Sequence, residues 1–216
     1  MGNTIKRYLM FFIGVAVNSF GISFITKSAM GTSQISSVPY VLSLKFTTLS
    51  FGAWSFLINL AFIFLQAGLL RKKFPPIQYL QILVNVVFSG LIDVSMGILS
   101  GFEPDTFWLR VLCALAGCAI LGFGITVEVA PDVLLVPGEG VVNALSEVSG
   151  KRFGTVKVIF DVTLILISVA LSFLFFGRLK GVGLATVISA LTVGQFINFF
   201  HSHIPYQKLP FLKGEK

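Results

Sequence analysis

The sequence is poor in charge. Only 12% of its 216 residues are Asp, Glu, Lys or Arg, against about a quarter in a soluble domain. Apolar residues make up 55% of the chain and the mean hydropathy is +0.91. The remaining charges gather between long apolar runs, which excludes an ordinary soluble domain and indicates that the lipid bilayer is the solvent.

The sequence also lacks the usual marks of an enzyme. No P-loop, dinucleotide fingerprint, Gly-x-Ser-x-Gly or His-Glu-x-x-His is present. The two cysteines, Cys113 and Cys118, are five residues apart in one apolar run and so off a common helical face, which favours packing over a disulfide or a metal site. His201 and His203 close the last run with no acidic residue nearby and fit an interfacial role better than a metal or catalytic pair. We expect no catalytic residue, no metal and no cofactor.

Six long apolar runs predict an all-α membrane protein. Each has about 20 residues, enough for a helix to cross a hydrocarbon core of roughly 30 Å. Backbone groups in lipid must bond within their own segment, and the alternation of a membrane β-barrel is absent. The predicted spans are 8–26, 51–70, 77–100, 107–129, 153–176 and 181–200.

The net charge of +7 is a topology signal and not a sign of nucleic-acid binding. Most basic residues fall on one side of the membrane if both termini are cytoplasmic, as the positive-inside rule requires. Arg178 and Lys180 violate the rule. We therefore predict a multi-pass protein of the cytoplasmic membrane, with its first span retained and not cleaved as a signal peptide. The basic residues on the predicted inner side are Lys6, Arg7, Arg71, Lys72, Lys73, Lys151, Arg152, Lys208, Lys213 and Lys216.

The first half of the chain is faintly repeated in the second. Residues 14–23 align with 117–126 at an offset of 103, and Phe51-Gly52 aligns with Phe153-Gly154 at an offset of 102. Three spans per repeat place the two halves upside down relative to each other, as in solute transporters that bind substrate at the repeat interface. The predicted division is 1–104 and 105–204 for the repeats and 205–216 for a basic cytoplasmic tail.

Each repeat carries a short apolar stretch after its first span, too short to cross the membrane. These stretches are either half-helices that enter the membrane and return, or amphipathic helices on its surface. A half-helix presents unpaired N–H groups and partial positive charge at its N-terminus, where small residues let a ligand approach. Gly31-Thr32-Ser33 and Gly138-Glu139-Gly140 occupy these positions, and the repeat pairs Gly31 with Gly138. Glu139 also suits a plain capping role.

Polar residues at membrane depth complete the predicted site. Asp161 lies near the middle of the fifth span with Lys157 one turn earlier, so the two either neutralise each other or leave Asp161 free to bind a cation, proton or amine. Asn59 is the repeat equivalent of Asp161. The predicted substrate-binding residues are Gly31, Thr32, Ser33, Asn59, Gly138, Glu139, Gly140, Lys157 and Asp161.

A second polar set suggests an interior seam between spans. Each member alone is equally compatible with a single interhelical hydrogen bond, contributing about 0.6 kcal/mol. Glycines in the first and fourth spans fit close helix packing. The predicted seam residues are Asn18, Asn85, Asp93, Gln195 and Asn198.

Several first-half segments resemble a known family. They are Phe20-Gly21-Ile22-Ser23, Lys27-Ser28-Ala29-Met30-Gly31-Thr32-Ser33 and Leu49-Ser50-Phe51-Gly52, which resemble the pattern of the bacterial YczE/YyaS/YitT membrane proteins. Where many relatives carry Trp-Asp, this chain has Ile35-Ser36, so it resembles a divergent branch. The resemblance implies a polytopic cytoplasmic-membrane protein of uncharacterised activity.

Two functional classes remain open. The first is a small-solute transporter, or the substrate-binding subunit of a transport complex such as the energy-coupling-factor type, with an unknown small molecule as substrate. The second is a non-transporting membrane protein that regulates or scaffolds a partner, which an exposed groove of small residues would favour. A membrane enzyme ranks third. Apart from the lipid bilayer, a protein partner or a second copy of the chain stays possible.

Overall fold

Every regular element of the chain is helical in the residues that the structure describes. The structure is a computed structural model that describes residues 2–204, so the predicted tail at 205–216 lies outside the described residues. The α-helices are α1 (Gly2–Lys27), α2 (Gln34–Lys45), α3 (Phe51–Leu70), α4 (Leu80–Ile98), α5 (Phe107–Val129), α6 (Pro137–Ser149), α7 (Phe153–Phe176) and α8 (Leu184–His203). Two 3₁₀ turns, η1 (Arg71–Lys73) and η2 (Pro76–Tyr79), join α3 to α4.

Six of these helices are long and apolar enough to cross a membrane, which confirms the predicted all-helical class with six candidate spans. The bounds predicted for α3, α5 and α7 are those observed. The third span begins in η2 because Pro75-Pro76 suits a turn. The last α-helix starts at Leu184 and not at 181, after a turn in which Gly181 takes a φ of 82°, a left-handed conformation that favours glycine.

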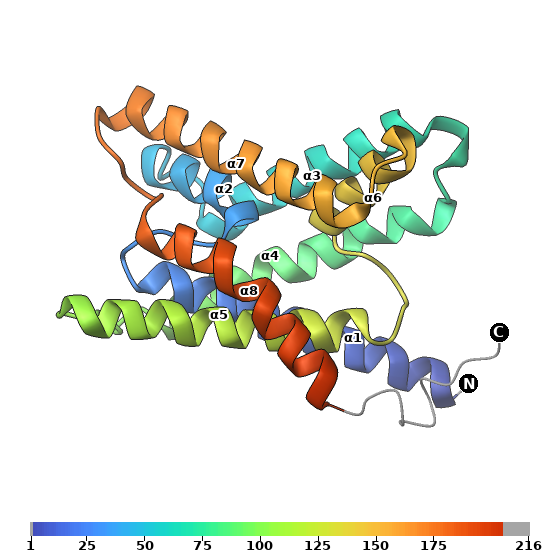
Figure 1. Ribbon diagram of the computed structural model, residues 1–216, viewed down its shortest axis with the longest axis horizontal. Helices are drawn as coiled ribbons and strands as arrows, with labels where there is room; N and C mark the ends of the chain where they lie inside the picture. Colours follow the sequence, from blue (N-terminus) through green and yellow to red (C-terminus); the bar gives the residue numbers. More distant parts are fainter. Residues whose placement is uncertain (1, 205–216) are drawn as a thin grey trace.

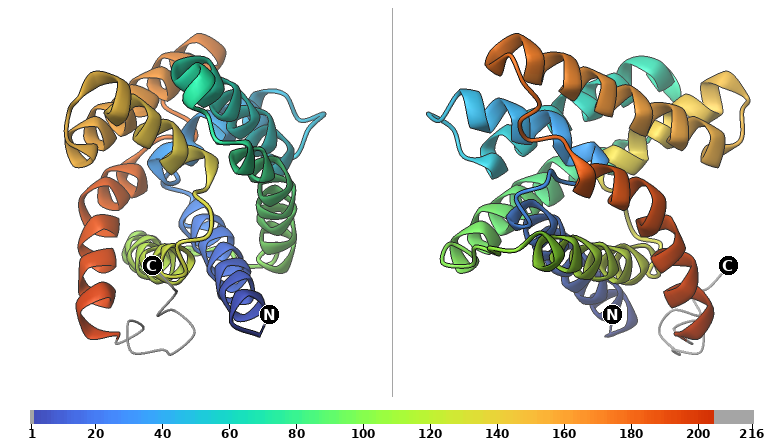
Figure 2. Two further views of the ribbon diagram at one scale, coloured as in Figure 1. Left: turned by 90° about the vertical axis from the view of Figure 1, so that its right-hand side faces the viewer. Right: turned by 60° about the vertical axis from the view of Figure 1, so that its left-hand side comes forward.

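The helices form two layers (Figure 1). One layer contains α8, α5, α1 and α4 in that lateral order, and the other contains α2, α3, α6 and α7 (Figure 2). The layers meet mainly where α3 packs on α4. Helices α7 and α8, at the opposite edge, have no comparable interface.

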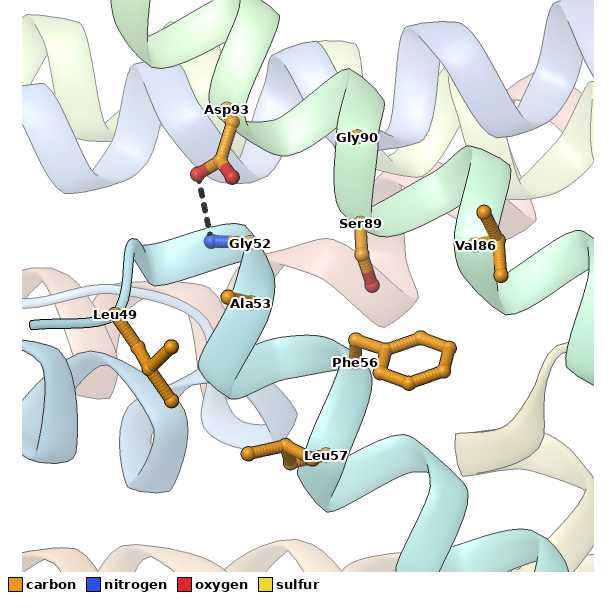
Figure 3. A pocket seen from close by; sticks show the side chains of 9 residues that line it. All are labelled: Leu49, Gly52, Ala53, Phe56, Leu57, Val86, Ser89, Gly90 and Asp93. Carbon is orange, nitrogen blue, oxygen red and sulfur yellow. Dashed lines mark hydrogen bonds between the residues drawn. The ribbon is translucent and has the colours of Figure 1, made fainter.

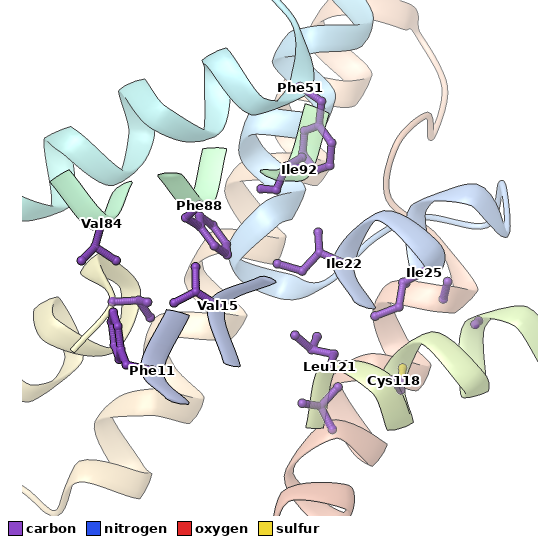
Figure 4. Packing of buried hydrophobic residues seen from close by; sticks show 14 residues of the cluster. Phe11, Val15, Ile22, Ile25, Phe51, Val84, Phe88, Ile92, Cys118 and Leu121 are labelled. Carbon is purple, nitrogen blue, oxygen red and sulfur yellow. The ribbon is translucent and has the colours of Figure 1, made fainter. Parts of the chain in front are cut away.

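Glycines allow α1 and α5 to cross in direct backbone contact. A β-carbon at Gly21 would lie 2.6 Å from the backbone N of Leu121, and one at Gly124 would lie 2.5 Å from that of Asn18. Gly117 packs in the same way on Ile25, so the two helices are antiparallel. The buried apolar side chains Ile22, Ile25 and Leu121 fill the crossing (Figure 4). This is the most extensive helix contact of the fold, as expected for small residues in membrane helices.

The two short helices lie inside the bundle. Helix α2 packs between α3 and α7, as does α6, and each buries a run of residues near its start. Both begin near the middle of the molecule and run toward opposite ends (Figure 1). Each short helix thus has its first turns buried among longer helices.

The starts of α2 and α6 touch. A β-carbon at Gly138 would lie 2.9 Å from Cδ1 of Ile35. Gly31, which the sequence pattern pairs with Gly138, lies elsewhere: it precedes α2 with a φ of 120° and packs on Thr186 and Gly183 at the start of α8. The contact partner of Gly138 is therefore Ile35.

The packing predicts a sharp contrast between glycines. Gly21→Ala and Gly124→Ala should each lower the free energy of unfolding by about 1–3 kcal/mol, because the added methyl meets backbone atoms. Gly90→Ala and Gly97→Ala, in α4 with open space around them, should be neutral or raise it by up to about 1 kcal/mol through helix propensity. Thermal unfolding of the purified variants in detergent measures the difference. Equal effects at all four positions would contradict the close crossing.

Candidate functional site

The start of α6 lies at the centre of the candidate site. Pro137 occupies the first turn and Glu139 follows it there, an acid near the positive end of the helix. Gln66 of α3 donates from Nε2 to the Pro137 carbonyl at 3.1 Å. A β-carbon at Gly140 would lie 2.5 Å from Oε1 of the same glutamine, so the close approach at Gly140 is filled by Gln66.

Three carboxyl groups and one lysine form an interacting charged group that includes the first turn of this helix. Lys157 Nζ donates to Asp161 Oδ1 at 2.8 Å within α7, so the structure shows the ion pair and not a free Asp161. Glu139 is close enough to both to interact electrostatically, and Glu128 of α5 interacts with Glu139 in the same way. The four side chains come from three elements that are distant in sequence, and their formal charge is net negative.

Asn18 and Glu128 form a buried polar pair across the α1–α5 crossing. Asn18 Nδ2 donates to Glu128 Oε2 at 2.8 Å. The two residues are 5% and 3% exposed. Sequence reasoning placed Asn18 in the seam but did not include Glu128 in the site, although a lone acid in the last turn of an apolar span is a signal for one.

The interface between α3 and α4 is polar along its length. Asn59 Nδ2 donates to Asn85 Oδ1 at 3.0 Å, and Asn85 Nδ2 donates to the Phe56 carbonyl at 2.9 Å. Gln66 and Gln81 exchange two hydrogen bonds of 3.2 Å nearer the other end. These glutamines were not among the predicted site residues, although their position in apolar spans is a signal for buried amides.

Asp93 of α4 lies at the end of this interface and caps the start of α3. Its Oδ1 accepts from the backbone N–H of Gly52 at 2.7 Å, and its Oδ2 accepts from Ser50 Oγ at 2.5 Å. The carboxylate thus satisfies the first turn of α3. Asp93 serves as an anchor between helices, away from the centre.

The remaining predicted residues lie before and at the start of α2 and on α8. Thr32 Oγ1 is 2.7 Å from Thr26 Oγ1, and the Thr32 N–H donates to Thr186 Oγ1 at 3.3 Å. Ser33 is buried as the N-cap residue of α2. Gln195 and Asn198 are exposed on α8, so the structure does not bring them into the interior seam.

An open groove of about 450 Å³ runs along the outer face of α3 and α4 (Figure 3). Asp93 is the one predicted residue at its wall, and its lining is mainly apolar. The groove is separate from the charged centre. Its lining residues are Leu49, Gly52, Ala53, Phe56, Leu57, Val86, Ser89, Gly90 and Asp93.

Comparison with known proteins places the chain in a family. No solved structure matches it. The uncharacterized protein YyaS of Bacillus subtilis (strain 168) is 22% identical over 200 residues, covering 90% of this chain and 92% of that protein. This similarity confirms the resemblance to a YyaS-type membrane protein at the distance of a divergent member. Residues 5–202 match the family of unknown function DUF6198, and the chain belongs to this family.

Proposed function

We propose that the protein is a small-solute transporter, or the substrate-binding subunit of a transport complex, built from two inverted repeats. The substrate binds where α2 and α6 begin. One observation carries the proposal: two half-helices start against each other in the middle of the molecule, Gly138 touching Ile35. Opposed half-helix starts near the bilayer midplane are a common way to build a transporter site.

The contacts at the α1–α5 crossing support the inverted repeat. Adding 103 to each first-half residue number, and subtracting it from each second-half number, turns the contact of Gly21 with Leu121 into that of Gly124 with Asn18. The same exchange relates the contact of Gly14 with Glu128 to that of Gly117 with Ile25. It maps the Ile35–Gly138 contact onto itself, which puts the pseudo-twofold axis at the meeting point of the half-helices.

The packing of the short helices supports the same exchange. Ser37 Oγ of α2 is 2.7 Å from Ser168 Oγ of α7. With the offset of 103 for α2 and the offset of 102 for α7, the corresponding pair is Gly140 of α6 against Gln66 of α3. At the level of elements, α4 on α1 corresponds to α8 on α5, and α2 on α7 corresponds to α6 on α3.

The chemistry of the centre suits a polar or charged solute. Two half-helix starts supply partial positive charge and N–H groups. Glu139, Lys157 and Asp161 supply groups that pair with a substrate ammonium or carboxylate. A solute that breaks the Lys157–Asp161 ion pair can pair one of its charged groups with Lys157 or Asp161. The remaining residue can then pair with a solute group of the opposite charge.

One interface breaks the symmetry and suggests how the site opens. Helices α3 and α4 are joined by amide pairs, whereas their equivalents α7 and α8 have no comparable interface. In an inverted repeat, exchanging the conformations of the halves gives the second access state. We propose that α7 packs on α8 in that state while α3 leaves α4, so that the layers rock about the α1–α5 crossing.

Basic residues support an orientation with the N-terminus in the cytoplasm. The start of α1, the η1 turn and the turn between α6 and α7 lie at the same end of the molecule (Figure 1). Lys6, Arg7, Lys72 and Lys151 are among the basic residues of these segments. The positive-inside rule assigns this end to the cytoplasm.

The groove on α3 and α4 favours the second candidate function, a protein that regulates or scaffolds a partner. Four of its lining residues are small: Gly52, Ala53, Ser89 and Gly90. Such a surface suits close contact with another membrane helix. A scaffold does not require a second access state, so an experiment that detects this state distinguishes the transporter from the scaffold.

Cross-linking tests the second state. The contact of Ser19 with Phe88 corresponds to that of Gly122 with Phe196, which gives an offset of 108 between α4 and α8. With this offset for α4 and the offset of 102 for α3, the Gln66–Gln81 pair corresponds to Ser168 and Ser189. After Cys113→Ala and Cys118→Ala, we expect the double variant Gln66→Cys/Gln81→Cys to form a disulfide from the observed state. Ser168→Cys/Ser189→Cys should form one from the second state. Both are measured by gel shift after mild oxidation in membranes.

Locking one pair should prevent the other. In the variant with all four cysteines, we expect either disulfide but not both in one chain, as mapped by proteolysis and mass spectrometry. The single-cysteine variants serve as controls. If Ser168→Cys/Ser189→Cys never cross-links, with or without a proton gradient, the protein holds one state and the scaffold candidate is favoured.

Ligand stabilisation tests the site. In a thermal-shift screen of metabolites on the purified protein, Asp161→Asn and Glu139→Gln should each abolish the stabilisation that a hit gives to the wild type. Gln195→Ala, an exposed polar residue of α8, should leave the shift unchanged and serves as the control. A hit whose shift survives both site variants would show that the ligand binds elsewhere.

A further inference from the structure

Glu128 is more deeply buried than the rest of the charged centre. It is 3% exposed, and the side chains of Lys157 and Asp161 are 27% and 18% exposed. Its hydrogen-bond donor is the neutral amide of Asn18, at 2.8 Å. The ion pairs found in residues 2–204 join Lys73 to Glu147 and Lys157 to Asp161, so neither includes Glu128.

The proposed repeat supplies an internal control for this pair. The equivalents of Asn18 and Glu128 are Leu121 and Ile25, both apolar and 4% and 0% exposed. The glycine that packs on Ile25, Gly117, corresponds to Gly14, which packs on Glu128. Leu121 and Ile25 show that apolar side chains are sufficient for the packing of this crossing. The carboxyl group of Glu128 is therefore not required for packing.

Within residues 2–204 no charged group forms an ion pair with Glu128. Glu139 of α6 is itself acidic. Arg7 of α1 donates from Nε and Nη2 to the Pro131 carbonyl and from Nη2 to the Asp132 carbonyl. Helix α8 carries His201 and His203 in its last turn, and α4 carries Asp93, which caps α3.

A carboxylate in this position costs several kcal/mol unless it binds a positive ion. Two kinds of ion are available, a metal cation or a proton. Among residues 2–204 no three His, Cys, Asp or Glu side chains gather as metal ligands. One carboxyl and one amide are too few for a metal cage, whereas a proton needs a single oxygen.

We infer that Glu128 binds and releases a proton, and that, in the transporter proposed above, the proton is the coupling ion. The inference rests on the proposed function only for the coupling. In the protonated form Oε1 carries the proton and Oε2 accepts from Asn18. On release the proton passes to water, and Asn18 Nδ2 continues to donate to the carboxylate. The Asn18 amide thus holds the side chain in place in both forms.

Infrared spectroscopy of the full chain in lipid vesicles tests the proton directly. At neutral pH we expect a carboxylic-acid carbonyl band that is lost completely in Glu128→Gln. Asp161→Asn is the control and should retain the band. Transfer from H₂O to D₂O should shift the whole band, because the proton exchanges with solvent. A wild type without the band, a band that persists in Glu128→Gln, or a band that D₂O does not shift would each overturn the inference.

The repeat also provides a variant that should fold. Asn18→Leu with Glu128→Ile copies the Leu121–Ile25 pair, so it should unfold at a temperature equal to or above that of the wild type. It should lack the carbonyl band. In vesicles loaded with a pH indicator it should also lose the proton entry that a metabolite hit from the thermal-shift screen drives in the wild type. Proton entry equal to that of the wild type would overturn the coupling. An exchangeable band in a protein that transports no solute would contradict the proposed function but leave the proton site intact.

Discussion

The backbone contact of α1 with α5 is the constraint on which the rest of the structure depends. Four glycines remove the side chains that would hold the two helices apart. Lipid tails are as apolar as leucine, so the association of these helices rests on close packing and not on burial from water. The segments that follow α1 and α5 turn back toward the same central region (Figure 1). The starts of α2 and α6 meet there.

Two short helices that begin close together bring two partial positive charges near each other. Each start carries partial positive charge, and their proximity is unfavourable unless negative groups lie nearby. Glu139 sits in the first turn of α6, with Asp161 and Glu128 around it. The first turn of α2 carries no acidic residue, and in the proposed repeat Ser36 is the equivalent of Glu139. The charge is therefore concentrated on the α6 side.

Sequence reasoning could predict the elements because hydrophobic length sets them. The bounds of α3, α5 and α7 follow from apolar runs flanked by turns that contain polar residues, proline or glycine. It could not predict the partner of Gly138, because the turn after α1 continues past Gly31 and packs on α8 before α2 begins. Gln195 and Asn198 share one helical face, and only the packing of α8 on α5 decides that this face is exposed. Lone amides such as Gln66 and Gln81 gain meaning only when two spans bring them together.

In the proposed repeat the glycine contacts of the two halves match, whereas the buried charged groups differ. The two properties have different consequences for transport. Matching glycine contacts on both sides of the axis mean that exchanging the conformations of the halves costs little in helix packing. In a purely symmetric protein the two access states have equal energy, and the binding of an ion does not distinguish one half from the other. The Asn18–Glu128 pair and its apolar equivalent Leu121–Ile25 remove that equality. A proton on Glu128 changes the charge of one half alone, so it shifts the balance between the states by its differential interaction with them. In the proposed transporter the symmetry allows the exchange of states, and the proton on Glu128 biases that exchange.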